Sequence, residues 1–131
     1  MSAFKGYYSL VQYCPNMDRC EAVNVGVVLF CPERQFIRAQ ITESLDRVYR
    51  VFGPGVETPQ HLRSMVNALR TRLELEQAEF KTLADLQKFV FTRANKVLLT
   101  SPKPVIVVEP EAELAALFSE LVAMPANSLA A

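Results

Sequence analysis

Residues 21–30 read Glu21-Ala22-Val23-Asn24-Val25-Gly26-Val27-Val28-Leu29-Phe30, and this stretch organises the rest of the chain. Seven of the ten residues are Val, Ala, Leu or Phe, and valine occurs four times. An apolar, β-branched run of this length predicts a strand that is covered on both faces and therefore lies centrally in a sheet. Asn24 is an amide that needs hydrogen-bond partners there. Gly26 indicates a bulge or a close backbone approach.

Strand-forming residues also lie on both sides of this stretch. Residues 7–13 are rich in strand-forming residues, three of them tyrosines. Residues 35–42 alternate between apolar and polar side chains, which is typical of a strand with one wet face. If the three strands form a meander, Gln12 falls near Asn24 and Asn24 falls near Thr42. Three hydrogen-bonding side chains would then share one end of the sheet.

Apolar residues at helical spacing, together with capping and stop signals, predict about four helices. Their approximate ranges are 45–52, 59–73, 82–90 and 110–122. Between the last two, residues 95–100 predict a short strand, and the run Val105-Ile106-Val107-Val108 predicts a second buried strand. Whether these two late strands extend the first sheet stays open.

This order of elements favours an α+β fold. We expect a single domain over residues 1–124, with a mostly antiparallel sheet that combines the N-terminal three-stranded meander with two C-terminal strands. The helices are expected to pack mainly on one face of that sheet. Residues 125–131 are expected to form a flexible tail.

Composition limits the classes of protein to which the chain can belong. It has 131 residues, half of them hydrophobic and 21% charged, with a formal net charge of zero. This balance is typical of an ordinary globular protein, and it argues against strong non-specific attraction to nucleic acid or to an anionic membrane. The apolar runs are too short to span a bilayer, and the N-terminus does not read as a signal peptide. The cytoplasm is therefore the expected location, without membrane association.

Three cysteines, Cys14, Cys20 and Cys31, are expected to be free thiols because their number is odd and no secretion signal precedes them. Their spacing fits no zinc motif, and the single histidine, His61, lies far along the chain. We expect no metal and no cofactor. A Cys–His nucleophile would require a long-range contact that nothing local predicts.

Arg19, Glu21 and Asn24 form the most suggestive group of candidate binding residues. Arg19 and Glu21 can form an ion pair beside an amide, at the point where a loop meets a rigid strand, and sites are often built in this way. The alternative is structural: the two charged residues stabilise the loop, and Asn24 satisfies backbone groups at a bulge. Both interpretations remain open on the sequence.

A second candidate surface is basic. Arg63 and Arg70 fall on one predicted helix, and Lys88 and Arg93 on or just after the next. Nucleic-acid binding would need these cations to form one continuous positive face with exposed aromatic side chains nearby. The alternative is that they are scattered surface cations.

Two blocks of the sequence carry a family resemblance. The first block is Tyr8-Ser9-Leu10-Val11-Gln12-Tyr13, Pro15, Arg19, Glu21 and Asn24-Val25-Gly26-Val27-Val28-Leu29. The second is Ser101-Pro102, Pro104-Val105, Pro110-Glu111-Ala112-Glu113-Leu114 and Leu117-Phe118. These blocks resemble a bacterial family catalogued as domain of unknown function 3037. That family is expected to have a small residue, often glycine, at the position of Cys20.

The resemblance implies a small bacterial cytoplasmic protein that is often encoded near a kinase-like protein of the HipA type. It points to an accessory, partner-binding role in a toxin–antitoxin or defence setting. The leading hypothesis is therefore a non-enzymatic protein that binds a protein partner or itself. The alternatives are a small-ligand-binding protein or enzyme that uses Arg19, Glu21 and Asn24, and a nucleic-acid-binding module that uses the basic helices.

Overall fold

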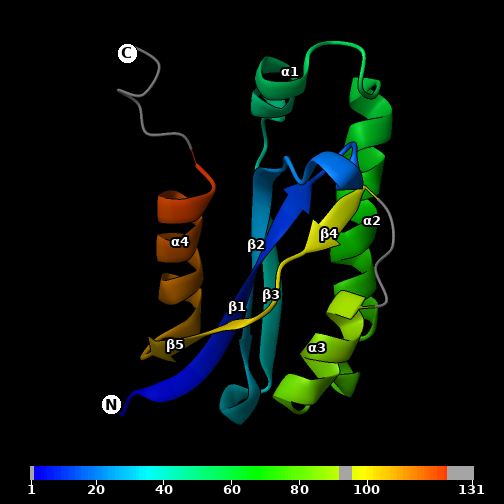
Figure 1. Ribbon diagram of the computed structural model, residues 1–131. Coiled ribbons are helices and arrows are strands. Elements are labelled where there is room, and N and C mark those ends of the chain that lie inside the picture. Colours follow the sequence, from blue (N-terminus) through cyan, green and yellow to red (C-terminus); the bar gives the residue numbers. More distant parts are fainter. Residues whose placement is uncertain (1, 92–95, 124–131) are drawn as a thin grey trace.

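The computed structural model describes residues 2–91 and 96–123 and confirms an α+β domain. An antiparallel sheet forms its middle layer, with α4 on one side and α2 and α3 on the other (Figure 1). The strand order is β3-β2-β1, and β4 and β5 both pair with the remaining side of β1. The two late strands therefore extend the N-terminal meander into one sheet.

The strands are β1 (Phe4–Tyr13), β2 (Val23–Cys31), β3 (Phe36–Ile41), β4 (Val97–Leu99) and β5 (Lys103–Val107). The helices are α1 (Asp46–Phe52), α2 (Pro59–Leu75), α3 (Leu83–Phe91) and α4 (Pro110–Leu121). Three short 3-10 turns are η1 (Met17–Arg19), η2 (Pro32–Arg34) and η3 (Gln77–Glu79).

The central strand β2 contains the predicted bulge. Val11 of β1 pairs with Gly26, but the next residue, Gln12, pairs with Asn24. Val25 is therefore the extra residue on β2, and it reverses the alternation of side chains between the two faces of the sheet. On either side of the bulge, alternate side chains of β2 point to opposite faces, so this strand supplies apolar side chains to two cores.

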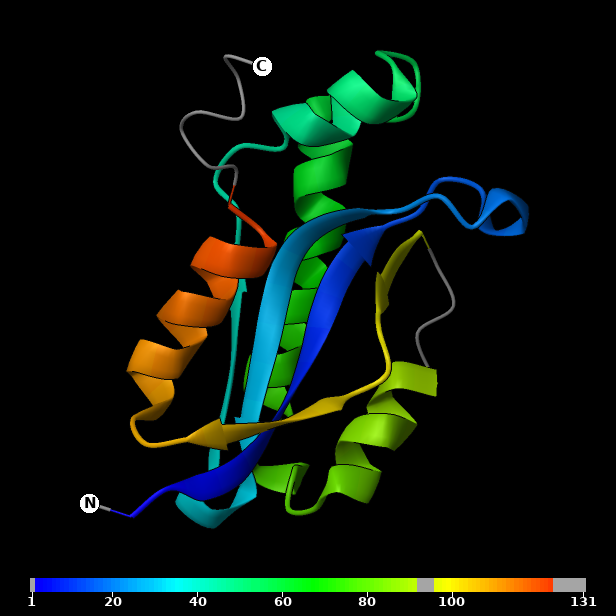
Figure 2. The same cartoon turned by 60° about the vertical axis from the view of Figure 1, so that its left-hand side comes forward.

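These two cores lie on opposite faces of the sheet. The first contains Val23, Val25, Val28 and Phe30 of β2 together with buried residues of α1, α2 and α3. The second contains Val27, Leu29 and Cys31 of β2 together with α4 and Val107. Three helices thus cover one face and a single helix covers the other, as Figure 2 also shows.

Gly26 also makes the predicted close backbone approach. A Cβ atom at this position would lie 2.5 Å from Ile41 Cδ1 and 2.9 Å from the carbonyl oxygen of Gln40. Only glycine allows β3 to pair this closely with β2 at the bulge.

Predicted capping signals are present at the helix ends. The Thr58 hydroxyl accepts a hydrogen bond from the backbone N–H of His61 at the start of α2. Gly53 ends α1 with a φ of 88°, a conformation that favours glycine. The Asp85 carboxylate accepts hydrogen bonds from the backbone N–H groups of Lys81 and Thr82 before α3.

The prediction of a strand at residues 105–108 is confirmed for residues 105–107, but the prediction that this strand is buried is wrong. In β5 only Val107 is buried; Ile106 is 65% exposed, and Val108, directly after the strand, is 45% exposed. The strand pairs with β1 alone, and successive side chains point to opposite faces. Val105 and Val107 reach the α4 core, but no residue of β5 reaches the core of α2 and α3. Ile106 and Val108 therefore face away from the only core that β5 joins.

Residues 125–131, where a flexible tail is expected, lie outside the described residues, as do Met124 and Asn95, the latter at the start of the predicted short strand.

Candidate functional site

Asn24 occupies the junction between the sheet and α4. Its Oδ1 accepts a hydrogen bond of 2.8 Å from Gln12 Nε2, and its Nδ2 donates one of 3.1 Å to the carbonyl oxygen of Leu121. The last carbonyl groups of a helix have no partner within the helix, so the amide satisfies one of them. The pairing of Gln12 with Asn24 agrees with the register predicted from the sequence.

Thr42 lies one residue away from the predicted register. Its backbone N–H donates to the carbonyl oxygen of Val25, and its hydroxyl donates to that of Ser44. Thr42 shares this end of the sheet with Asn24, but its hydroxyl bonds to the loop before α1 and not to the amide pair.

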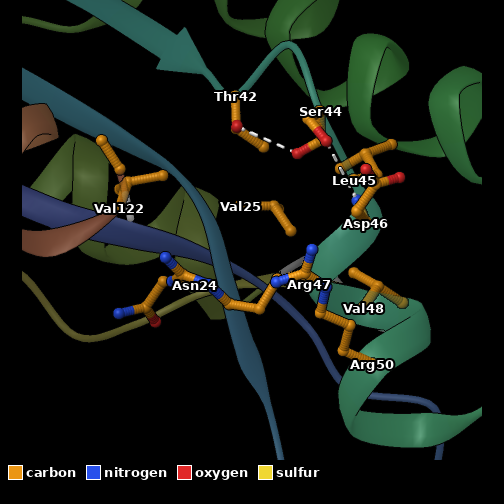
Figure 3. Close-up of a pocket in the computed structure, with 11 residues that line it drawn as sticks. Asn24, Val25, Thr42, Ser44, Leu45, Asp46, Arg47, Val48, Arg50 and Val122 are labelled. Carbon is orange, nitrogen blue, oxygen red and sulfur yellow. Dashed lines mark hydrogen bonds between the residues drawn. The ribbon is translucent and has the colours of Figure 1, made fainter. Parts of the chain in front are cut away.

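A cavity of about 290 Å³ lies beside Asn24, between the ends of β2 and β3, α1 and the end of α4 (Figure 3). Its apolar lining consists of Val25, Leu45, Val48, Val122 and Ala123. Its polar lining consists of Asn24, Thr42, Ser44, Asp46, Arg47 and Arg50. In Figure 3, Thr42 and Ser44 lie on one side of Val25, and Asn24, Arg47 and Arg50 lie on the other. Two arginines and an amide are donors suited to a small anion.

Arg19 and Glu21 lie elsewhere. Arg19 Nε and Glu21 Oε1 are 2.6 Å apart, and the two side chains are 68% and 54% exposed. They line a separate hollow with Val51 and Phe52, and neither is among the described residues that line the cavity beside Asn24. The structure therefore brings Arg19 to Glu21 but does not bring this ion pair to Asn24.

The predicted basic residues have different surroundings. Arg63 donates to the carbonyl oxygens of Thr42 and Glu43, and Arg70 donates to Asn67 Oδ1. Both side chains thus contact α2 itself or the loop before α1. Arg93 lies outside the described residues.

Lys88 is exposed on α3, where the surrounding surface carries both signs of charge. The hollow that it lines also contains Arg72 and three carboxylates, those of Glu76, Glu79 and Asp85. Such a mixed surface does not provide the continuous positive face that nucleic-acid binding needs.

A cluster of polar side chains that was not predicted surrounds Glu57, whose side chain is only 10% exposed. Its carboxylate accepts hydrogen bonds from Lys96 Nζ at 2.8 Å and from the Tyr13 hydroxyl at 3.3 Å, and His61 Nε2 lies 3.3 Å away. The Tyr49 hydroxyl donates to the backbone carbonyl of Glu57. These residues come from β1, α1, α2 and two connecting segments, so no local motif could have revealed the cluster.

The cluster changes two pKa values. The hydrogen bond from Lys96, with its positive charge, holds the pKa of Glu57 below its ordinary value, although burial acts in the opposite direction. Burial, and secondarily the Glu57 carboxylate, raises the pKa of Tyr13 to about 12. A salt-bridged carboxylate and a neutral phenol are poor general bases at neutral pH. The cluster therefore fits the role of a polar network that stabilises the fold better than that of a catalytic site.

None of the three cysteines forms a disulfide; Cys14 and Cys31 are buried and Cys20 is exposed. Burial, together with the nearby Glu113, raises the pKa of Cys31 to about 11, which keeps this thiol protonated and unreactive.

In the parts of the chain that the structure describes, no group of three His, Cys, Asp or Glu residues could hold a metal ion. Across the same ranges, no helix combines the length and the apolar character that a membrane span needs.

The outer side of β5 is a surface of a different kind, which we call the β5 edge and define as residues 103–109. Ile106 and Val108 are exposed here, between the exposed charges of Lys103 and Glu109. The described residues place no strand on this side of β5. The β5 edge therefore combines unpaired strand backbone with exposed apolar side chains.

Residues 8–122 match the sequence profile of the family described as "Protein of unknown function (DUF3037)". The chain belongs to this family. The match spans both blocks of the resemblance found in the sequence. Comparisons with curated proteins and with solved structures gave no match.

Cys20 departs from the expected DUF3037 pattern, since a small residue, often glycine, is expected at this position. Its φ is 56°, which lies in the left-handed region that glycine adopts most readily.

Proposed function

We propose that this DUF3037 protein is a cytoplasmic, non-enzymatic interaction protein, and that its β5 edge binds a partner chain in an extended conformation. The observation that carries the proposal is the exposure of Ile106 on β5, whose outer side is unpaired, and of Val108 directly after this strand. Among the described residues, four large apolar side chains are exposed, and these two lie only two positions apart in the sequence.

The physical basis is the behaviour of edge strands. A free edge presents a row of unpaired N–H and C=O groups that can pair with another strand, and proteins commonly blunt such edges with lysine, proline or other charged residues. Lys103 and Pro104 do this in the first half of β5, but Ile106 in its second half and Val108 directly after it are exposed and apolar. An added strand would gain main-chain hydrogen bonds and would cover these two side chains.

The family resemblance suggests the first heterologous partner to test. It associates the chain with bacterial kinase-like proteins of the HipA type in a toxin–antitoxin or defence setting. A strand or extended terminus of such a protein is the segment that would pair with β5.

The test is affinity purification of tagged protein from its native host, followed by reconstitution of the captured complex from purified components. Ile106→Lys places a charge on the β5 edge, and Leu75→Lys is a matched control because Leu75 is 79% exposed at the end of α2. We expect a stoichiometric partner, or a second copy of the chain, that is lost with Ile106→Lys and retained with Leu75→Lys. Equal retention by both variants, or a protein that binds neither a partner nor itself, would contradict the proposal.

The cavity beside Asn24 favours a second candidate function, the binding of a small anionic ligand. Arg50 is exposed at its rim, and Asn24, Thr42 and Ser44 supply further polar groups. A thermal-shift screen with inorganic phosphate and small dicarboxylates tests this function. Binding at the cavity predicts a rise in Tm that Arg50→Ala abolishes, with Arg19→Ala as the control, whereas a rise that both variants keep would place the ligand elsewhere.

A further inference from the structure

We infer that the partner of the β5 edge is a second copy of this chain, bound by antiparallel pairing of the two β5 strands about a two-fold axis at Ile106. The inference rests on the proposed function and names its partner. The evidence for a second copy as the partner is the order of charged and apolar residues along the β5 edge.

In this register each charge faces an opposite charge. Lys103 lies opposite the second copy's Glu109, and Glu109 lies opposite the second copy's Lys103. Both side chains are exposed in the single chain and are free to form these pairs. Opposite charges directly across two antiparallel strands stabilise the pairing, and the two-fold axis produces the contact twice.

The apolar side chains also meet one another. Ile106 lies opposite the second copy's Ile106, and Val108 lies opposite the second copy's Pro104. All three residues project to the same face of the sheet, because alternate side chains of a strand share a face. The exposed apolar surface of each β5 edge is therefore covered by the same surface of the other copy.

The backbone allows this register, although Pro104 has no N–H group and cannot donate a hydrogen bond to the second copy's Val108. Along an edge strand, the N–H and C=O groups of successive residues point alternately towards and away from the neighbouring strand. In this register odd-numbered residues pair with odd-numbered ones and even-numbered with even-numbered ones. Residues whose backbone groups point away from β1 therefore meet each other. β5 itself ends at Val107, and the chain bends at Val108 and Glu109 before α4 begins. Glu109 keeps extended backbone angles, with φ of −124° and ψ of 112°.

Other registers lose the charge complementarity. A shift by two residues in one direction places Lys103 opposite Val107, and a shift in the other direction places Glu109 opposite Val105. Each shift sets a charge against an apolar side chain of β5 that packs towards α4. The register centred on Ile106 avoids this mismatch.

Helix α4 packs against β2 and β3, which pair on the other side of β1 from β5, and it also covers Val105 and Val107 of β5. Figure 2 shows β5 leading directly into α4. A two-fold axis perpendicular to the sheet would place both copies of α4 on one face, each over its own β2 and β3. The paired β5 strands would join the two sheets into one.

Sedimentation velocity over a concentration series, with charge-reversed chains, tests the inference. Lys103→Glu alone creates two carboxylate–carboxylate contacts across the axis, and Glu109→Lys alone creates two ammonium–ammonium contacts. We expect each variant to dimerise roughly tenfold more weakly than the natural chain, because like charges directly opposite destabilise paired strands. An equimolar mixture of the two variants should form a mixed dimer, since every contact across its axis is again attractive. Glu21→Lys, on the exposed loop before β2, is the charge control and should dimerise normally.

A cross-linking experiment gives an independent measurement. Residues directly opposite in an antiparallel pair lie close enough for a disulfide, so Ile106→Cys in a Cys20→Ser background should form a covalent dimer on mild oxidation. Val51→Cys, at an exposed apolar position on α1, should not.

Different failures have different meanings. A natural chain that stays monomeric over the whole concentration series would overturn the inference, as would a dimer that both charge reversals leave intact. If a monomeric chain still loses a heterologous partner on Ile106→Lys, the self-association is wrong but the proposed function stands. If Ile106→Lys changes the binding of no partner and no second copy, both are wrong.

Discussion

Asn24 accepts a hydrogen bond from Gln12 and donates one to the last carbonyl of α4, so a single amide joins the central strands to the helix on one face of the sheet. The need of this amide for partners could be predicted from its apolar neighbours in the sequence. Its connection to Leu121 could not, because 97 positions separate the two residues along the chain.

Asn24→Ala should lower the free energy of unfolding by about 1–3 kcal/mol, because it leaves the Gln12 amide and the Leu121 carbonyl without this partner. Urea denaturation monitored by circular dichroism measures the change. The double variant Asn24→Ala/Gln12→Ala should be less destabilised than the sum of the two single variants, since the two side chains share one hydrogen bond. Strict additivity would show that the amide pair does not act as a unit.

Tyr13 predicts a dependence of stability on alkaline pH. Its phenol ionises near 10.0 when exposed, but its pKa is raised to about 12 in the fold. A raised pKa means that the folded state binds the proton more tightly, so this stabilisation is fully present below pH 10 and is lost as the pH rises from 10 to 12. Tyr13→Phe should lose stability less steeply over this window, as measured by urea midpoints. The other tyrosines are common to both proteins, and parallel losses would contradict the assignment to Tyr13.

At the scale of elements, the strands and helices follow from local patterns. The apolar run at residues 21–30 forms the central strand, and the caps at Thr58 and Asp85 begin helices where the sequence places them. The run at residues 105–108 was interpreted as buried for the same reason as β2, but it is exposed on one side. An apolar run shows that a strand prefers to be covered, but it does not show whether the same chain supplies the cover.

The bulge in β2 is the element that a single substitution tests best. Gly26→Ala should lower the free energy of unfolding by about 1–3 kcal/mol, because the added methyl group meets the Ile41 side chain and the Gln40 carbonyl. Gly55→Ala, which meets nothing within 4 Å, is the control and should stay within about 0.5 kcal/mol of the natural chain.

A second variant separates the two contacts at the bulge. Ile41→Val removes the side-chain atom closest to position 26, so it should recover part of the loss in the Gly26→Ala background. Full recovery would show that the backbone contact with Gln40 is unimportant. No loss in Gly26→Ala itself would show that β2 and β3 can separate without cost.

At the scale of the whole molecule, residues that are neighbours in sequence need not share a site. Arg19, Glu21 and Asn24 lie within six positions, yet the ion pair and the amide line different hollows. Conversely, the Glu57 cluster brings together side chains from distant segments. The pattern of apolar residues in a sequence shows whether one segment forms a helix or a strand and which of its faces is buried. Clusters such as the one around Glu57 depend instead on how several elements pack together. For this reason the fold could be predicted more fully than any site.

The β5 edge is likewise a property of the whole molecule, because its exposure depends on which strands and helices cover which parts of the sheet. The apolar residues that the sequence assigned to a core are the ones that the fold leaves free to bind another chain. If a second copy covers them, the prediction of a covered strand is satisfied by the dimer instead of by the single chain.

The most direct test of this account is to follow the backbone amide resonances of the natural chain by NMR as the protein is diluted. We predict that dilution shifts the resonances of residues 103–109 and of the adjoining part of β1, and that Ile106→Lys gives the dilute spectrum at every concentration. Resonances that do not change on dilution, or changes confined to α2 or to the cavity beside Asn24, would contradict self-association through β5.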